Sequence, residues 1–114
     1  MRNGAGGTAV SAILRTLLVV LSAACSSSPP PAKHVTVEAS GFAFKPAEIR
    51  VAVGDTVTFH NADMVPHNVS SGTAFDSDSL RSGAAWTWVA DRSGRVDYEC
   101  KYHPTMKGTI VVEK

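Results

Sequence analysis

Apolar side chains recur at every second position from about Lys33 onward, and no stretch of that region holds a convincing helical period. Alternation in steps of two is the period of a β-strand that buries one face. The alternating sets are Val35, Val37 and Ala39; Ile49, Val51 and Val53; Val57 and Phe59; Trp86 and Trp88; Val96, Tyr98 and Cys100; and Ile110 and Val112. Residues that favour turns lie between these sets, at Gly41, Pro46, Gly54, Gly72, Gly83, Gly94 and Gly108. This pattern predicts an all-β fold, an antiparallel Greek-key β-sandwich of seven to eight strands in which both tryptophans pack.

Residues 1–25 differ from the rest of the chain and indicate an export signal. Arg2 and Arg15 precede a short apolar run at 17–21, which is too short to span a bilayer as a permanent helix. Small residues then stand directly before Cys25, as in the lipobox of bacterial lipoproteins, where the cysteine becomes the lipid-modified N-terminus. The alternative is ordinary signal cleavage, with Cys25 discarded or left free. We expect an exported protein, periplasmic or at the cell surface, that is anchored to the membrane through lipid on Cys25.

Residues 26–32 predict an extended tether between this anchor and a folded domain at 33–114. The segment begins Ser-Ser-Ser-Pro-Pro-Pro, which buries nothing and cannot form a β-ladder. A disulfide between Cys25 and Cys100 is disfavoured because it would join a linker to the end of a strand.

The charge of the folded region argues against nucleic acid as a partner. The whole chain has a formal net charge of +1, but Arg2 and Arg15 lie in the leader, so the remaining 9 of 11 basic side chains face 10 acidic ones. A domain with a charge of about −1 lacks the excess of basic side chains that is typical of proteins that bind nucleic acid. We expect a nearly neutral monomer.

Four side chains form the donor set of a copper site. Cys100, His103 and Met106 are three residues apart, and His67 supplies a second imidazole. A thiolate, two imidazoles and a weakly held thioether suit a copper ion that transfers electrons. Since Cys100 has the strand parity of Val96 and Tyr98, it is expected at the end of a strand, with His103 in a tight loop after it. The loop bearing His67 would be tied to the C-terminal hairpin by the metal.

These residues also have plainer interpretations. Cys100 alone is more often a small buried apolar residue, and Met106 alone is more often part of the core. A structural zinc ion prefers four sulfur or nitrogen ligands and seldom takes a thioether. His34 and His60 are expected at the surface, and Met64 is expected as an exposed residue near the site. Asn61 and Asn68 are candidates to support the ligand loops, although a plain turn role suits them about as well.

Several segments together resemble the cupredoxins, the blue copper proteins. They are Phe44-Lys45-Pro46 with Ile49-Arg50-Val51, residues 54–59 (Gly-Asp-Thr-Val-Thr-Phe), Pro66-His67-Asn68-Val69, and Tyr98-Glu99-Cys100 with residues 103–108 (His-Pro-Thr-Met-Lys-Gly). The short Cys-x-x-His-x-x-Met loop is similar to that of the amicyanin group. The resemblance covers nearly all of residues 35–113. It implies a type 1 copper site with equatorial ligands His67, Cys100 and His103 and axial ligand Met106.

The same resemblance implies a protein that shuttles single electrons between redox partners. We expect the edge of His103 to lie near the surface as the exit for the electron. Transient partners would dock on an apolar patch formed by Met64, Pro66, Tyr102 and Pro104. Resemblance to the amicyanin group further implies that His103 leaves reduced copper and takes a proton in mild acid.

A second function from another class uses the same ligands. It is copper binding for storage, delivery or resistance, without a redox partner. An enzyme is not expected, because the sequence holds no second histidine cluster for a catalytic copper and no paired catalytic carboxylates in a recognisable motif.

Overall fold

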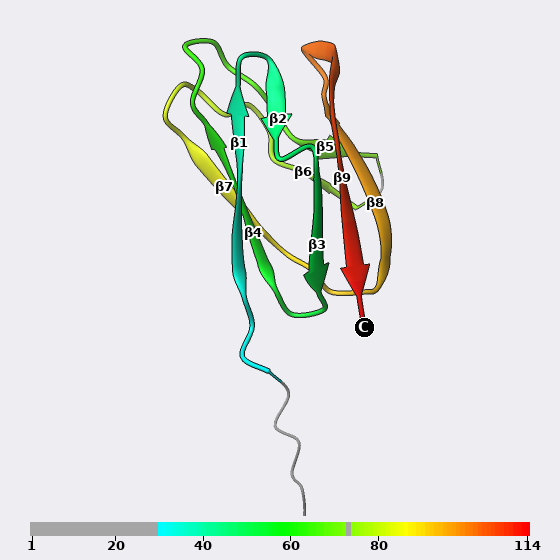
Figure 1. The fold of residues 1–114 in the computed structure, drawn as a ribbon. Coiled ribbons are helices and arrows are strands. Elements are labelled where there is room, and N and C mark those ends of the chain that lie inside the picture. Colours follow the sequence, from blue (N-terminus) through cyan, green and yellow to red (C-terminus); the bar gives the residue numbers. More distant parts are fainter. Residues whose placement is uncertain (1–29, 73) are drawn as a thin grey trace, which may run out of the picture.

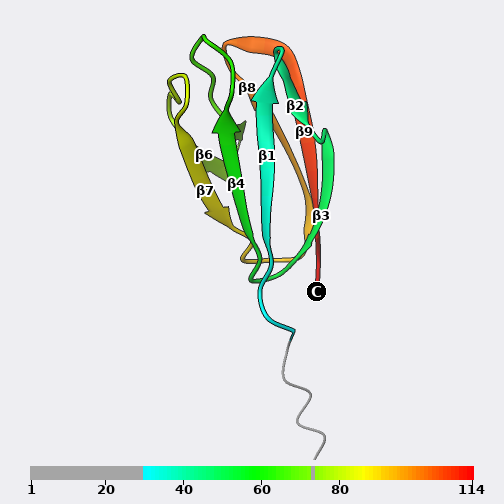
Figure 2. The same cartoon turned by 60° about the vertical axis from the view of Figure 1, so that its left-hand side comes forward.

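The computed structural model describes residues 30–72 and 74–114, and these form two β-sheets packed face to face (Figures 1 and 2). The predicted leader, Cys25 and residues 26–29 of the predicted tether lie outside the described residues. The strands are β1 (His34–Ser40), β2 (Ala43–Lys45), β3 (Glu48–Ala52), β4 (Thr56–Asn61), β5 (Ser70–Ser71), β6 (Phe75–Asp76), β7 (Ala85–Val89), β8 (Gly94–Cys100) and β9 (His103–Glu113). Among the described residues there is no helix with the length and apolarity that a membrane span needs.

The two sheets have four and five strands. One has the order β2-β1-β4-β7 and the other the order β3-β9-β8-β5-β6. The all-β sandwich predicted from the alternation is therefore confirmed, with nine strands in the described ranges where seven to eight were expected, because β5 and β6 have only two residues each.

The expectation of purely antiparallel pairing is wrong at two places. Strands β1 and β4 pair in parallel, and so do β3 and β9. Between β2 and β3 the chain passes from one sheet to the other, so β4 returns beside β1 by a crossover and not by a hairpin. The alternation of side chains is the same for both strand directions, which is why it could not distinguish them.

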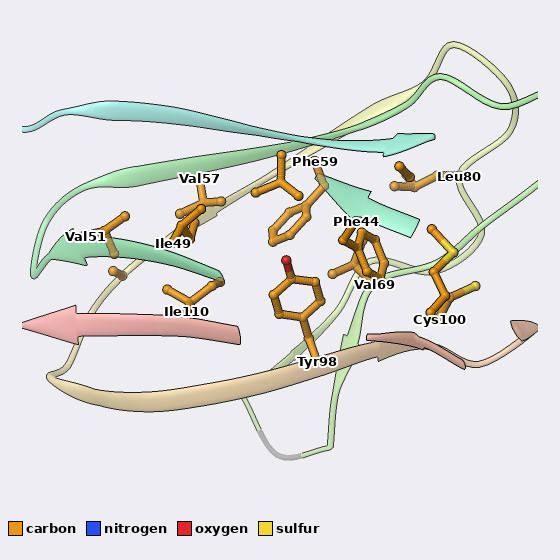
Figure 3. Close-up of a cluster of buried hydrophobic side chains, with 14 of the residues drawn as sticks. Phe44, Ile49, Val51, Val57, Phe59, Val69, Leu80, Tyr98, Cys100 and Ile110 are labelled. Carbon is orange, nitrogen blue, oxygen red and sulfur yellow. The ribbon is translucent and has the colours of Figure 1, made fainter. Parts of the chain in front are cut away.

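Apolar side chains from both sheets fill the space between them (Figure 3). Tyr98 lies at the centre, with its ring edge-on to Phe44 and Phe59 at centroid distances of 4.9 and 5.2 Å. Such edge-to-face pairs add about 0.5–1.5 kcal/mol each beyond the burial of their area. Trp86 and Trp88 are half-buried and pack against this cluster, as the sequence predicted.

Gly108 makes room for the ring of Tyr98. The sequence predicted a turn at Gly108, but β9 runs unbroken from His103 to Glu113. Gly108 lies opposite Tyr98 in the β8–β9 ladder, and a Cβ atom at residue 108 would come within 2.3 Å of the tyrosine ring and hydroxyl. Among the described residues the buried Tyr98 hydroxyl has no hydrogen-bond partner, and burial raises the pKa of Tyr98 well above its ordinary value.

We expect Gly108→Ala to destabilise the domain by about 1–3 kcal/mol, because the added methyl group would overpack the core against the buried ring of Tyr98. Urea unfolding measures the change. In a double-mutant cycle, Tyr98→Leu should recover part of the loss, since the two residues are in contact. An unchanged urea midpoint in Gly108→Ala would contradict the close contact.

One end of the sandwich receives the tether, and the opposite end carries the predicted ligands. At one end the chain enters β1, and the Asp55 carboxylate accepts hydrogen bonds from the backbone N–H groups of Ala52 and Lys33, both at 2.8 Å. These two N–H groups hold the pKa of Asp55 below its ordinary value. The β1–β2 turn and the β8–β9 hairpin lie at the opposite end (Figure 1). The predicted ligands are therefore far from the point where the tether joins the domain.

Candidate metal centre

Two segments bring the predicted ligands to one end of the sandwich. His67 lies between β4 and β5 and pairs with Leu80 through an isolated β-bridge, N–H to carbonyl in both directions. Cys100 ends β8 and His103 begins β9, so only Lys101 and Tyr102 separate the two strands. The ladder shifts register between Glu99 and Cys100, and irregularities of this kind re-aim side chains near functional sites. His103 thus opens a strand, where the sequence placed it within a loop.

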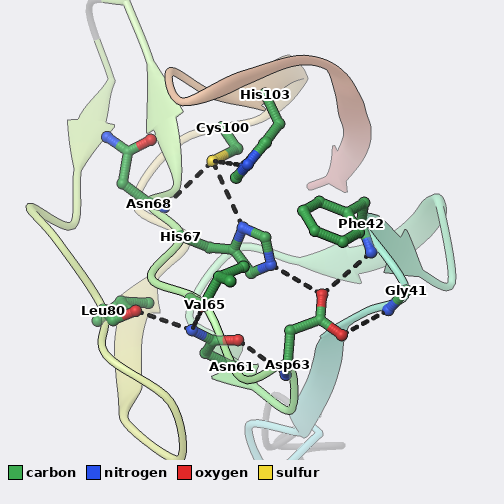
Figure 4. A network of polar contacts seen from close by, with 10 residues as sticks. All are labelled: Gly41, Phe42, Asn61, Asp63, Val65, His67, Asn68, Leu80, Cys100 and His103. Atoms are coloured by element: carbon green, nitrogen blue, oxygen red, sulfur yellow. Dashed lines mark hydrogen bonds and ion pairs between the residues drawn. The ribbon is translucent and has the colours of Figure 1, made fainter.

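The three donor atoms converge on one point (Figure 4). Cys100 Sγ lies 3.8 Å from His67 Nδ1 and 3.7 Å from His103 Nδ1. All three atoms lie within 4.8 Å of one another. Two atoms that bind one ion at about 2.0–2.3 Å, spread by a trigonal angle, are about 3.5–4 Å apart. The spacing therefore fits a shared metal ion.

Met106, the fourth predicted ligand, is an internal residue of β9. Its side chain is 1% exposed and belongs to the same buried cluster as Cys100. Cys100 and His67 are equally buried, whereas His103 is partly exposed. The chemistry of this set favours copper over zinc, because a thioether is a soft ligand that suits cuprous ion.

Asn68 binds both the sulfur of Cys100 and the backbone of the hairpin that follows it. Its backbone N–H donates to Cys100 Sγ at 3.4 Å, and its side-chain oxygen accepts from the N–H of Lys101 at 2.7 Å. Asn61 ties down the segment before His67, donating to the carbonyl oxygens of Val65 and Leu80 at 2.8 Å each. Asn68 therefore fixes the ligand loops, whereas Asn61 has both expected roles, because its side-chain oxygen also accepts from the N–H of Asp63 at 2.9 Å in a local turn.

Asp63 is a supporting residue that the sequence analysis missed. Its Oδ2 accepts a hydrogen bond from His67 Nε2 at 2.8 Å, which leaves Nδ1 of that ring free for a metal. The carboxylate also accepts from the N–H groups of Phe42 at 3.0 Å and Gly41 at 2.7 Å. The N–H of Phe42 and then the His67 side chain lower the pKa of Asp63 to about 2. Its position four residues before His67 in a loop carries no periodic signal that would have revealed it.

The other two histidines lie outside this cluster, as predicted. His34 Nε2 is 2.9 Å from the Thr58 hydroxyl on the exposed face of the β1–β4 sheet. His60 Nδ1 lies 2.7 Å from Glu38 Oε2 on the same face. Both are directed away from the core because their strand positions have the outward parity.

Comparison with known proteins agrees with the geometry. Residues 12–112 match the family described as Cupredoxin-like domain. The chain belongs to the cupredoxin family. This cupredoxin is 33% identical to amicyanin-alpha of Methylorubrum extorquens over 119 residues, which cover 99% of this chain and 100% of the relative.

Solved structures show the same fold. An amicyanin mutant with Cu(I) superposes with a TM-score of 0.67 at 29% identity, covering 70% of this chain and 82% of the other. A purple cupredoxin from Nitrosopumilus maritimus gives a TM-score of 0.66 at 26% identity, covering 69% and 99%. Within the family, a cluster of His67, Cys100, His103 and Met106 is typical of a type 1 copper site, so copper is the cofactor. The kinship with amicyanins also confirms that this cupredoxin is not an enzyme.

Proposed function

We propose that the chain is a type 1 (blue) copper protein that shuttles single electrons between redox partners outside the cytoplasmic membrane. In this proposal His67, Cys100, His103 and Met106 would hold the copper ion. The convergence of two Nδ1 atoms and one sulfur at 3.7–3.8 Å carries the proposal. Bound copper would supply a one-electron couple between its cupric and cuprous states.

The surroundings of the ligands suit rapid transfer. Asp63 fixes the ring of His67, and Asn68 fixes both the sulfur and the hairpin through its backbone and its side chain. Donors that are already held by hydrogen bonds need little movement when the charge of the centre changes. His103 is partly exposed and its Nδ1 lies 3.7 Å from the buried sulfur, so its outer edge offers a short route to a partner.

Apolar residues are exposed on the two segments that carry His67 and His103. Met64 is 90% exposed and Tyr102 51%, and Pro66 and Pro104 are also exposed. His103 and Tyr102 line a depression of about 400 Å³ with Val65, Pro66 and Ser79. Small, largely uncharged contact surfaces suit short-lived redox encounters. We propose this patch as the docking surface for transient redox partners.

We expect Met64→Glu to slow electron self-exchange between oxidised and reduced copies on the order of tenfold or more, because two patches that meet would then oppose like charges. NMR line broadening in mixtures of the two oxidation states measures the rate, and the visible spectrum should stay unchanged. Val53→Glu is the matched control, since Val53 is an exposed apolar residue in the β3–β4 turn at the other end of the sandwich. Equal rates in both variants would remove the docking proposal.

Electron transfer and copper handling differ in how they treat the metal. A carrier keeps its copper through repeated oxidation and reduction, whereas a storage or delivery protein yields it to competing ligands. Copper reconstitution of the chain from Ala32 onward, followed by optical and EPR spectra and a redox titration, tests the proposal. A reversible couple without copper loss would support it, and copper loss to a chelator on reduction would favour delivery.

We also propose that the protein is exported and anchored through lipid on Cys25. The support is the pattern at residues 1–25, a short apolar run and small residues directly before the cysteine. Labelled fatty acid should enter the wild-type protein in a bacterial host and be absent from Cys25→Ala. Equal labelling of both proteins, or of neither, would exclude this anchor.

A further inference from the structure

The turn between β1 and β2 contains a phenylalanine in an unfavourable backbone conformation. Ser40 pairs with Ala43, so Gly41 and Phe42 form a two-residue hairpin turn, with φ angles of +62° and +59°. Positive φ at both central residues is typical of a type I′ turn, which favours asparagine, aspartate or glycine there. A bulky side chain with positive φ is a genuine outlier, and outliers of this kind gather at functional sites.

A carboxylate from a distant segment holds this turn. Asp63 Oδ1 accepts from Gly41 N–H at 2.7 Å and Oδ2 accepts from Phe42 N–H at 3.0 Å. Oδ2 also accepts from His67 Nε2 at 2.8 Å, so one oxygen serves both the turn and a copper ligand (Figure 4). The negative charge strengthens all three hydrogen bonds.

The ring of Phe42 lies against both predicted histidine ligands. Its centroid is 4.9 Å from that of His103 and 5.6 Å from that of His67, with interplanar angles of 79° and 84°. The two imidazoles are themselves 5.0 Å apart, so the three rings contact one another. Phe42 is nevertheless 51% exposed, which makes it a poor contributor to the hydrophobic core.

We propose that Phe42 is a positioning residue for the copper centre. The Asp63 carboxylate keeps residue 42 in the left-handed conformation, and the phenylalanine ring then clamps the imidazoles of His67 and His103 in the orientation that binds copper. This inference rests on the proposed copper function and deepens it. It assigns a role to a strained, half-exposed aromatic side chain that the metal donor set does not include.

A clamp and a merely stabilising side chain predict different results. Asparagine and glycine tolerate positive φ, so Phe42→Asn and Phe42→Gly remove the ring and relieve the backbone strain together. The copper-free variants should therefore be at least as stable as the wild type. The copper-loaded variants should hold their metal less firmly, because the imidazoles have lost the ring that restricts them.

The experiment compares wild type, Phe42→Asn, Phe42→Gly and the control Val53→Asn, which removes an exposed apolar side chain far from the centre. Urea midpoints are measured without copper, and EPR spectra and the rate of copper loss to a chelator are measured with it. In both Phe42 variants we expect unchanged or higher midpoints, an altered Cu(II) EPR spectrum and copper loss about tenfold faster. The control should match the wild type in spectrum and in rate of copper loss.

Two results would overturn the clamp: an unchanged EPR spectrum and release rate in both Phe42 variants, or faster release accompanied by a fall in the copper-free midpoint, which would show a role in stability alone. A wild-type protein that takes up no copper would instead refute the proposed function.

Discussion

Replacement of Cys100 by serine is expected to abolish the blue colour and the type 1 EPR spectrum of the copper-loaded protein. The thiolate is the soft, anionic donor of the site, and a serine hydroxyl is a neutral, hard one. Cys100 Sγ also lies 3.8 and 3.7 Å from the two imidazole nitrogens, and among the described His, Cys, Asp and Glu side chains only these two histidines cluster with it. The expected change is complete loss of the intense visible band.

The fold of this variant should survive, so the loss can be assigned to the ligand. A serine hydroxyl can accept the hydrogen bond that Asn68 N–H now donates to the sulfur at 3.4 Å. It can also donate to an imidazole Nδ1, so burial of the hydroxyl leaves no polar group unsatisfied. Amide NMR spectra of the copper-free wild type and Cys100→Ser check this point.

Two methionines provide a matched comparison for the same spectra. Met106→Leu, at the buried thioether, should keep the colour and shift the reduction potential, because a weakly held thioether ligand would tune it. Met64→Leu, at a side chain that is 90% exposed, should change neither. A blue Cys100→Ser protein would show that the copper binds at another site.

The sandwich could be predicted because its strands bury one face. Val57 and Phe59 alternate with outward polar residues, as Tyr98 and Cys100 do, and all four are buried in the structure. Strand β5, by contrast, consists of two serines buried through their backbone pairing and not through apolar character. No hydrophobic pattern reveals such a strand.

The proximity of Cys100 and His103 could be predicted from local sequence, whereas the residues that support the ligands could not. Cys100 and His103 are joined by a two-residue connection, so a strand-end position brings them together. Asp63, in contrast, accepts hydrogen bonds from Gly41 and Phe42, which are more than 20 residues away in the sequence. A positive φ at a phenylalanine contradicts its own preference, so only tertiary contacts reveal it.

Removal of copper is expected to lower the stability of the folded domain strongly. His67 and Cys100 are 33 residues apart in the chain, and a shared ion would join the segment after β4 to the β8–β9 hairpin. An ion that binds the folded chain and not the unfolded one stabilises it by about 4 kcal/mol when free copper is about 1,000 times Kd. For a domain of this size, that is a shift in melting temperature on the order of 15–30 °C.

Thermal unfolding of copper-free and copper-loaded protein, followed by circular dichroism, measures this difference. Cys100→Ser is the matched control, because it keeps the fold and lacks the thiolate, so added copper should raise its midpoint far less. Equal midpoints for the two wild-type forms would mean that copper binds the unfolded chain as tightly as the folded one. That result would show that the fold does not preorganise the four side chains as a copper site. A preorganised site binds the ion only after folding has brought its donors together.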